Sequence, residues 1–258
     1  MAPRLFGFIE SYALMLGLGI FAALFLFEFY FRKVLKVPSG KMFYLEIPLL
    51  VAIAVGLAGA YLTQNLYDFI QDPAHYSWNW SLTFYGGLLF GVPTFLLLYF
   101  LWGKKHYPNG LWTILLVAPS SISLAHGLGR IGCFLGGCCY GQHTDAWYGV
   151  HFETTADKVI PTNLFEAIFL LLLFGILLFL LLKWKTPFGM PIYMISYGIW
   201  RFLIEFIRDD YRGSFIPGLT PSQFWSILAV VFGIIYIIVL IWMKKKDKFP
   251  KEVNDGAI

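Results

Sequence analysis

Charged residues are scarce in this 258-residue chain: Asp, Glu, Lys and Arg make up only 13% of it, whereas 59% of the residues are hydrophobic. Soluble domains contain about 25% charged residues, so the composition excludes a water-soluble protein. Intrinsic disorder is also excluded, because disordered chains combine low hydrophobicity with a high net charge. The formal net charge of +4 is too small to indicate binding to nucleic acid, and we expect no nucleic-acid partner.

Cysteine is scarce as well, since the chain contains only Cys133, Cys138 and Cys139. Three cysteines this close together exclude a disulfide-stabilised scaffold. They lack the Cys-x2-Cys pairs of a zinc ribbon, and the adjacent Cys138 and Cys139 are poorly spaced for two ligands of one ion. We therefore expect no metal and no cofactor. A disulfide from Cys133 to either of the other two, or buried thiols that line a cavity wall, are the remaining interpretations.

Long apolar stretches are abundant, and seven of them are long enough for a helix that crosses the roughly 30 Å core of a bilayer. The sequence therefore predicts an all-α polytopic membrane protein with seven transmembrane helices, forming a single integral membrane domain over residues 1–258 with an outer loop at 132–162. The first stretch has no cleavage signal and is interpreted as a retained span. The expected spans are about 8–30, 43–66, 82–102, 111–131, 163–183, 188–207 and 221–243.

The positions of the cations predict the orientation. With seven spans, 13 of the 19 Lys and Arg residues fall on one side of the membrane and six on the other. The positive-inside rule then places the N-terminus outside and the C-terminus in the cytoplasm. Twelve of the 13 cytoplasmic cations are Lys, whereas five of the six outer cations are Arg. Because Arg binds phosphate with a planar fork, the outer set favours an anionic substrate. Internal pairing is the alternative, with these possible partners: Glu153, Glu166, Glu205, Asp209 and Asp210.

The segment from His126 to Gly141 is rich in glycine, with six glycines in sixteen residues. This pattern predicts that the helix ends abruptly near residue 131 and that non-helical backbone lines a cavity into which Arg130 points. Close packing between helices is the alternative explanation of the small residues.

Two other segments contain polar residues in membrane spans. Tyr197, Arg201, Glu205 and Arg208 are spaced by four, four and three residues, which predicts one polar helix face and an intrahelical pair between Arg201 and Glu205. Near the start of the third span, Tyr85-Gly86-Gly87 predicts free backbone donors that could hold a phosphate, with Tyr85 at the mouth of this site.

These segments together resemble the phosphatidylglycerol–prolipoprotein diacylglyceryl transferase family. The strongest element is Gly129-Arg130-Ile131-Gly132-x-Phe134, followed by Gly137 and Gly141. The other elements that are similar to family motifs are Ser11-Tyr12-Ala-Leu-Met15, Tyr85-Gly86-Gly87, Pro161-Thr-Asn-Leu-Phe-Glu166 and Tyr197-Gly-x-x-Arg201-Phe202 with Glu205-Phe206-x-Arg208. The chain departs from the usual signature at Cys133 and Gly136, where Asn is common, at Cys138, where Glu is common, and at Tyr85, where His is common. It therefore represents a variant with a Gly-Cys-Cys-Tyr-Gly ending.

The resemblance implies transfer of the diacylglyceryl group of phosphatidylglycerol to the lipobox cysteine thiol of a prolipoprotein. It implies a thioether product, release of glycerol phosphate and a site near the outer leaflet of the bacterial inner membrane. The reaction needs a held phosphate and a deprotonated thiol. The predicted catalytic residues are Arg130, Arg201, Tyr85 and His126, and the predicted substrate-binding residues are Arg130, Tyr12, Gly86, Gly87, Gly141, Tyr197, Glu205 and Arg208.

The identity of the proton acceptor stays open among Tyr85, Tyr197 and His126. His126 precedes Arg130 by one helical turn and lies on roughly the same face, and its ordinary pKa suits a base. Two other functions are alternatives: an anion or lipid transporter, and a non-catalytic paralog that binds lipid or lipoprotein. The chain has no internal repeat of its Arg-containing motifs, which argues against the transporter.

Overall fold

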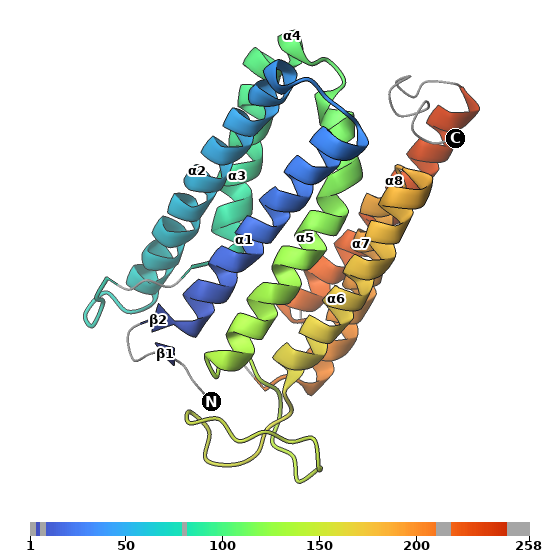
Figure 1. Cartoon of the computed structure of the whole chain (residues 1–258). Coiled ribbons are helices and arrows are strands. Elements are labelled where there is room, and N and C mark those ends of the chain that lie inside the picture. The colour runs from blue at the N-terminus through green and yellow to red at the C-terminus, as the bar shows by residue number, and fades with distance from the viewer. Residues whose placement is uncertain (1–3, 6–8, 79–81, 210–217, 247–258) are drawn as a thin grey trace. The chain divides into compact units, whose positions relative to one another are not determined.

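The structure is a computed structural model that describes residues 4–5, 9–78, 82–209 and 218–246. Helices dominate the described residues, which contain in addition a pair of two-residue antiparallel strands, β1 (Arg4–Leu5) and β2 (Ile9–Glu10) (Figure 1). The chain divides into two compact units. One comprises Met1–Tyr30 and Ile114–Ile258, and the other comprises Phe31–Thr113.

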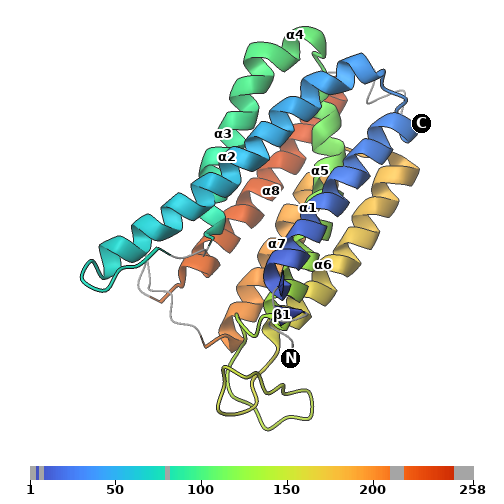
Figure 2. The same ribbon diagram turned by 60° about the vertical axis from the view of Figure 1, so that its left-hand side comes forward.

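The described part of the first unit contains five long helices. The start of α1, the end of α5 and the start of α6 lie at the same end of this unit (Figures 1 and 2). A loop over residues 136–161 connects α5 to α6 at this end. The last helix begins with a capping box, in which Thr220 and Gln223 satisfy each other's backbone N–H groups. The helices are α1 (Ser11–Phe29), α5 (Gly110–Leu135, mostly in this unit), α6 (Thr162–Phe179) with a π-helical turn (Leu180–Trp184), α7 (Gly189–Ile204) with a 3-10 turn (Glu205–Ile207), and α8 (Pro221–Lys245).

The second unit is built around two antiparallel helices, α2 (Ser39–Gln71) and α3 (Phe84–Leu98). Small residues allow their backbones to approach closely, because a Cβ atom at Gly91 would lie 3.1 Å from the Ala52 carbonyl oxygen. The unit begins with most of the π-helical turn Tyr30–Val34. After α3 it continues through the π-helical turn Tyr99–Gly103 and α4 (Lys104–His106).

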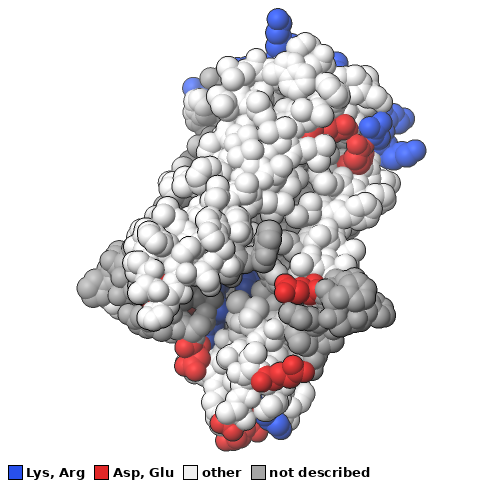
Figure 3. Space-filling view, turned by 90° about the vertical axis from the view of Figure 1, so that its left-hand side faces the viewer, with Lys and Arg blue, Asp and Glu red and all other residues white. Residues whose placement is uncertain are grey.

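Six helical segments of the described chain are long and apolar enough to cross a membrane, so this is a multi-pass membrane protein. Each overlaps a predicted span: Ser11–Val34, Ser39–Ile70, Gly86–His106, Gly110–Leu135, Thr162–Trp184 and Pro221–Lys245. The remaining predicted span, 188–207, corresponds to α7, whose 16 residues fall short of a full crossing. The face in Figure 3 is mostly uncharged, which matches the exposed apolar side chains of the long helices.

The prediction that the helix ends abruptly within the glycine-rich segment is confirmed, but α5 continues as regular helix to Leu135, four residues beyond the expected end near residue 131, and the break begins at Gly136. Glycines in this part of α5 serve close packing, which was the alternative explanation. A Cβ atom at Gly132 would lie 3.0 Å from the Met15 Cβ atom and 3.3 Å from the Tyr12 Cα atom of α1. The sequence could not distinguish the two roles, since both require a residue without a side chain.

Gly132→Ala is expected to destabilise the protein relative to Gly129→Ala by about 1–3 kcal/mol, because the added methyl group overpacks the contact with α1. A Cβ atom at Gly129 meets nothing within 4 Å, so this neighbour in the same helix is a matched control. Both substitutions gain helix propensity equally, and the difference isolates the packing term. Thermal unfolding of the two purified variants in detergent measures it. Equal stability would contradict the packing role of Gly132.

Candidate active site

A buried ion pair between α5 and α6 forms the first part of the candidate site. The Nε atom of Arg130 lies 3.1 Å from the Oε2 atom of Glu166, whose side chain is completely buried. The hydroxyl of Tyr197 on α7 donates a hydrogen bond of 2.8 Å to the other oxygen, Oε1. A buried carboxylate requires such partners, because an isolated charge in an apolar interior is costly. Glu166 therefore joins three helices around the Arg130 guanidinium.

His126 lies beside this pair. Its Nε2 atom is 4.0 Å from the Glu166 Oε1 atom, and its Nδ1 atom is 3.4 Å from the hydroxyl of Tyr193. The imidazole also meets the ring of Tyr197 edge-on, with 4.9 Å between ring centroids. The prediction that His126 and Arg130 share a helix face is confirmed, since both side chains point toward Glu166.

A second ion pair lies where α7 ends. The Nη1 atom of Arg201 is 2.7 Å from the Oε2 atom of Glu205, and its Nη2 atom donates a hydrogen bond of 2.8 Å to the Ser222 hydroxyl. The Thr220 hydroxyl donates a 2.8 Å hydrogen bond to the other oxygen of Glu205. Both Ser222 and Thr220 lie at the start of α8, so the cap of one helix orients the arginine of another. The predicted intrahelical pair of Arg201 and Glu205 is confirmed.

A third arginine lies close to this second ion pair. The Nε atom of Arg208 is 4.0 Å from the Oε2 atom of Glu205, which already pairs with Arg201. Two guanidinium groups therefore lie beside the Glu205 carboxylate. The Arg130 side chain also keeps 17% of its surface exposed. Internal pairing therefore occurs, and the cluster nevertheless suits an additional anion.

The loop after α5 contacts the end of α7. Gly141 forms an antiparallel bridge with Arg208, and the Gln142 backbone N–H donates to the Ile207 carbonyl over 2.9 Å. A Cβ atom at Gly141 would collide with that same carbonyl oxygen. Gly141, a predicted substrate-binding residue, thus has a packing role here, because only glycine lets the loop approach the backbone beside Arg208.

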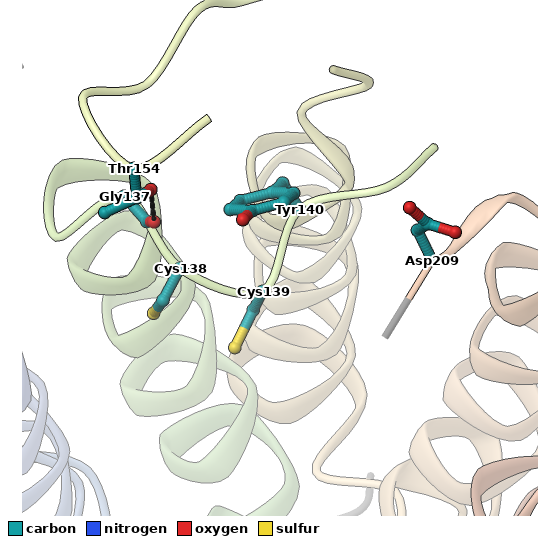
Figure 4. Close-up of a pocket in the computed structure, with 6 residues that line it drawn as sticks. All are labelled: Gly137, Cys138, Cys139, Tyr140, Thr154 and Asp209. Atoms are coloured by element: carbon teal, nitrogen blue, oxygen red, sulfur yellow. Dashed lines mark hydrogen bonds between the residues drawn. The ribbon is translucent and has the colours of Figure 1, made fainter. Parts of the chain in front are cut away.

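The three cysteines gather at the same loop, and none of them forms a disulfide. The neighbouring Cys133 and Cys138 thiols lower the pKa of the Cys139 thiol, and the positive charges of Arg130 and Arg208 act in the same direction. A pocket of about 350 Å³ adjoins two of the thiols (Figure 4). It is lined by Gly137, Cys138, Cys139, Tyr140, Thr154 and Asp209.

The other predicted residues are placed as follows. Tyr12 of α1 packs against Gly132, beside the end of α5. Gly86 and Gly87 belong to the second unit. There, a Cβ atom at Gly86 would lie 2.7 Å from the Gly59 carbonyl oxygen, and the Gly87 N–H donates to the Thr83 carbonyl. Gly86 thus serves helix packing, and the Gly87 donor is already used. The Tyr85 side chain lies outside the described residues.

Sequence reasoning missed Glu166, Thr220 and Ser222 as members of the site. Glu166 is the last residue of the segment Pro161–Glu166 that resembles a family motif, and it was considered only as a partner for arginine. A lone carboxylate in the fifth span was the signal that could have identified it. Thr220 and Ser222 carry the ordinary signal of a helix start, which does not reveal that their hydroxyls orient an arginine and its carboxylate.

Comparison with known proteins gives one consistent family. The model of the prolipoprotein diacylglyceryl transferase family matches residues 4–239. A phosphatidylglycerol–prolipoprotein diacylglyceryl transferase of Clostridium tetani is 34% identical over 90% of this chain and 93% of its own length. A second such protein, from Clostridium perfringens, is 35% identical over 96% of this chain and 95% of its own length. A third such protein, from Dehalococcoides mccartyi, is 28% identical over 93% of this chain and 91% of its own length. Together with the buried arginines, these matches mean that the chain belongs to the prolipoprotein diacylglyceryl transferase family.

Proposed function

We propose that this protein transfers the diacylglyceryl group of phosphatidylglycerol to the lipobox cysteine of prolipoproteins. The observation that carries the proposal is the arginine cluster, in which Arg130 pairs with Glu166 and keeps 17% of its side chain exposed, and Arg201 pairs with Glu205. The names of the relatives support the same substrates. Positive charge held in a poorly hydrated site is what a departing phosphate requires, because negative charge develops on the phosphate as the ester bond breaks.

The reaction joins sulfur to carbon. The substrate thiol loses its proton to solvent, and its sulfur attacks the glyceryl carbon that carries the phosphate ester. The S–C bond forms as the C–O bond breaks, and the electron pair leaves with glycerol phosphate. In this proposal Arg130 and Arg201 hold the phosphate oxygens. Each ionic hydrogen bond that strengthens in the transition state contributes about 1.5–3 kcal/mol.

The other residues position these arginines. Glu166 and Tyr197 hold Arg130, and Glu205 with Ser222 holds Arg201 in one orientation. His126 contacts Glu166 and Tyr193 and thereby fixes the same end of the cluster. Preorganised donors lower a barrier more than mobile ones, because they need no rearrangement as charge develops.

The membrane topology is part of the proposal. The 16 residues of α7 span about 24 Å, and the 3-10 turn Glu205–Ile207 brings this segment close to the roughly 30 Å of a bilayer core. The helix packs along α8, since a Cβ atom at Gly198 would lie 3.0 Å from the Ser226 carbonyl oxygen. With α7 as a seventh crossing, the N-terminus is outside and the arginine cluster faces the outer leaflet of the bacterial inner membrane, where exported precursors meet lipid.

Purified protein is expected to add the mass of one diacylglyceryl group to a synthetic lipobox peptide in phosphatidylglycerol vesicles, as measured by mass spectrometry. A peptide with Ser in place of the cysteine is the control, and it stays unmodified because its hydroxyl is a far weaker nucleophile. Vesicles of phosphatidylcholine alone are a second control. An unmodified cysteine peptide in the presence of correctly folded protein would contradict the proposed function.

A further inference from the structure

All three cysteines of the chain meet at the end of α5. The Sγ atoms of Cys133, Cys138 and Cys139 lie within 4.8 Å of one another. Cys133 belongs to the last turn of the helix, and the Cys138 backbone N–H donates to its carbonyl over 3.1 Å. The tight turn after the helix thereby brings residues five and six positions apart into contact.

The backbone of this turn is strained in a way that places the sulfurs together. Adjacent side chains of an extended strand point to opposite sides. Here Cys139 has a φ of +61°, which costs a residue with a Cβ atom about 1–2 kcal/mol. Gly137 also has a positive φ, of +68°. As a result the Cys138 and Cys139 side chains leave the loop on the same side (Figure 4).

The start of α6 holds the strained turn in place. The side-chain amide of Asn163 donates to the Cys138 carbonyl over 2.7 Å, and the Thr162 hydroxyl donates to the Cys139 carbonyl over 3.1 Å. Asn163 and Thr162 are themselves completely buried. Backbone strain that the surrounding structure maintains is typical of functional sites, because a strained residue costs free energy and ordinary packing does not require it.

Three preorganised thiols match the ligand preference of a thiophilic ion. Around one Zn²⁺, with Zn–S bonds of about 2.3 Å and tetrahedral geometry, the sulfurs lie about 3.8 Å apart. The cluster is therefore about 1 Å from that arrangement at most, which small side-chain rotations provide. Among the described His, Cys, Asp and Glu side chains, these three cysteines make up the whole group. The fourth coordination position of a tetrahedral ion is therefore open. Three protein ligands with an open position are characteristic of catalytic zinc sites.

The fourth coordination position is accessible from outside the cluster. Cys138 is exposed, and Cys138 and Cys139 both line the 350 Å³ pocket. Arg130 precedes Cys133 by three residues on α5, so its guanidinium shares a face with the first thiol. A sulfur at the fourth position would thus lie next to the arginine that holds the phosphate in the proposed function.

We propose that Cys133, Cys138 and Cys139 bind one Zn²⁺ ion and that the lipobox cysteine thiol of the substrate occupies its fourth coordination position. The second half rests on the proposed function. Zn²⁺ deprotonates a coordinating thiol, and the proton passes to solvent. The bound thiolate then attacks the glyceryl carbon, and the ester electron pair leaves with glycerol phosphate. The ion undergoes no redox change. Sequence spacing argued against this site because Cys138 and Cys139 are adjacent, and the left-handed backbone at Cys139 removes that objection.

Cobalt spectroscopy of the purified full-length protein tests the metal site independently of activity. In detergent with a non-thiol reductant, Co²⁺ is expected to bind at one equivalent per chain, with the charge-transfer absorption of thiolate ligands and the visible bands of a tetrahedral ion. Zn²⁺ should displace it. Loss of a ligand costs more than an outer-shell change, so Cys133→Ser, Cys138→Ser and Cys139→Ser should each weaken Co²⁺ binding by more than about tenfold. His143 is an exposed histidine in the same loop, and the control variant His143→Ala should leave the Co²⁺ spectrum unchanged.

Adding the lipobox peptide tests the substrate half. The cysteine peptide is expected to shift the visible Co²⁺ bands, whereas the serine peptide should not. A chelator should abolish lipidation of the peptide, and Zn²⁺ should restore it. Absence of thiolate–Co²⁺ absorption from folded wild-type protein, or a disulfide that forms without metal uptake, would overturn the site. Bound Co²⁺ with no peptide-induced shift, or full lipidation by the chelated protein, would overturn the catalytic half. Intact Co²⁺ binding with no lipidation under any condition would refute the proposed function and leave the metal site standing.

Discussion

Arg130→Ala is expected to lower the rate of diacylglyceryl transfer by about 100-fold to 1000-fold, as loss of one oxyanion donor does elsewhere. The physical reason is that, in the proposed function, the α5 guanidinium provides positive charge where the phosphate departs. Its Nε atom is paired with Glu166, while 17% of the side chain surface remains exposed. The lipobox peptide assay at saturating lipid measures the loss as kcat/KM.

A loss of activity could also reflect misfolding, because Arg130→Ala leaves the completely buried Glu166 without its partner. Breaking a buried pair in this way destabilises a protein by about 3–5 kcal/mol. The double variant Arg130→Ala with Glu166→Gln removes both charges and keeps an acceptor for the Tyr197 hydroxyl. We expect its thermal stability to recover toward that of the wild type while its activity stays low. Recovery of activity together with stability would contradict a role of Arg130 in binding phosphate.

Arg130→Lys separates charge from geometry. Lysine keeps the positive charge but lacks the planar fork that holds a carboxylate and a phosphate at once. Its activity is therefore expected to lie between those of the wild type and Arg130→Ala. Activity equal to that of Arg130→Ala would mean that the fork, and not the charge, is essential.

The helices could be predicted from the sequence because a membrane span is a local property. Each of the six long helical segments overlaps a stretch chosen by apolar length alone, and the expected span 188–207 corresponds to the shorter α7. The contacts along one helix were equally predictable. The pair of Arg201 with Glu205 and the shared face of His126 and Arg130 follow from a repeat of 3.6 residues.

Contacts between distant helices could not be predicted in the same way. Nothing in the local sequence pairs Arg130 with Glu166, or Arg201 with Ser222, since each pair depends on which helices become neighbours. The end of α5 lies four residues beyond the expected one, because glycine weakens a helix on average but also permits close packing, and the packing against α1 prevailed at Gly132. The gathering of the thiols depends on one left-handed residue, Cys139, where residue type gives no warning.

Arg201→Ala is expected to reduce transfer by about 100-fold or more with a smaller effect on stability than Arg130→Ala. The smaller effect follows from the surroundings of Glu205, which keeps the Thr220 hydrogen bond of 2.8 Å and has Arg208 at 4.0 Å. The activity loss follows from removal of the second guanidinium near the departing phosphate. Transfer assays and thermal unfolding of the same preparation measure both quantities. A variant that retains half of the wild-type activity would exclude Arg201 from the reaction.

Ser222→Ala is the matched control for orientation. It removes the 2.8 Å hydrogen bond to the Arg201 Nη2 atom and leaves the ion pair with Glu205 in place. A single hydrogen bond of this kind contributes about 0.5–1.5 kcal/mol, so activity should fall about twofold to tenfold. A loss as large as that of Arg201→Ala would mean that the start of α8, and not the guanidinium, determines the rate.

Combining Arg130→Ala with Arg201→Ala asks whether the two arginines act on one phosphate. The two are linked through the structure, since Tyr197 lies one turn before Arg201 on α7 and donates to Glu166, the partner of Arg130. Groups that stabilise the same developing charge act as a unit, and removal of either forfeits most of their joint contribution. The double variant should therefore be little slower than the slower single variant. Losses that multiply would instead mean that the arginines act on separate charges, because independent contributions to the barrier add in free energy.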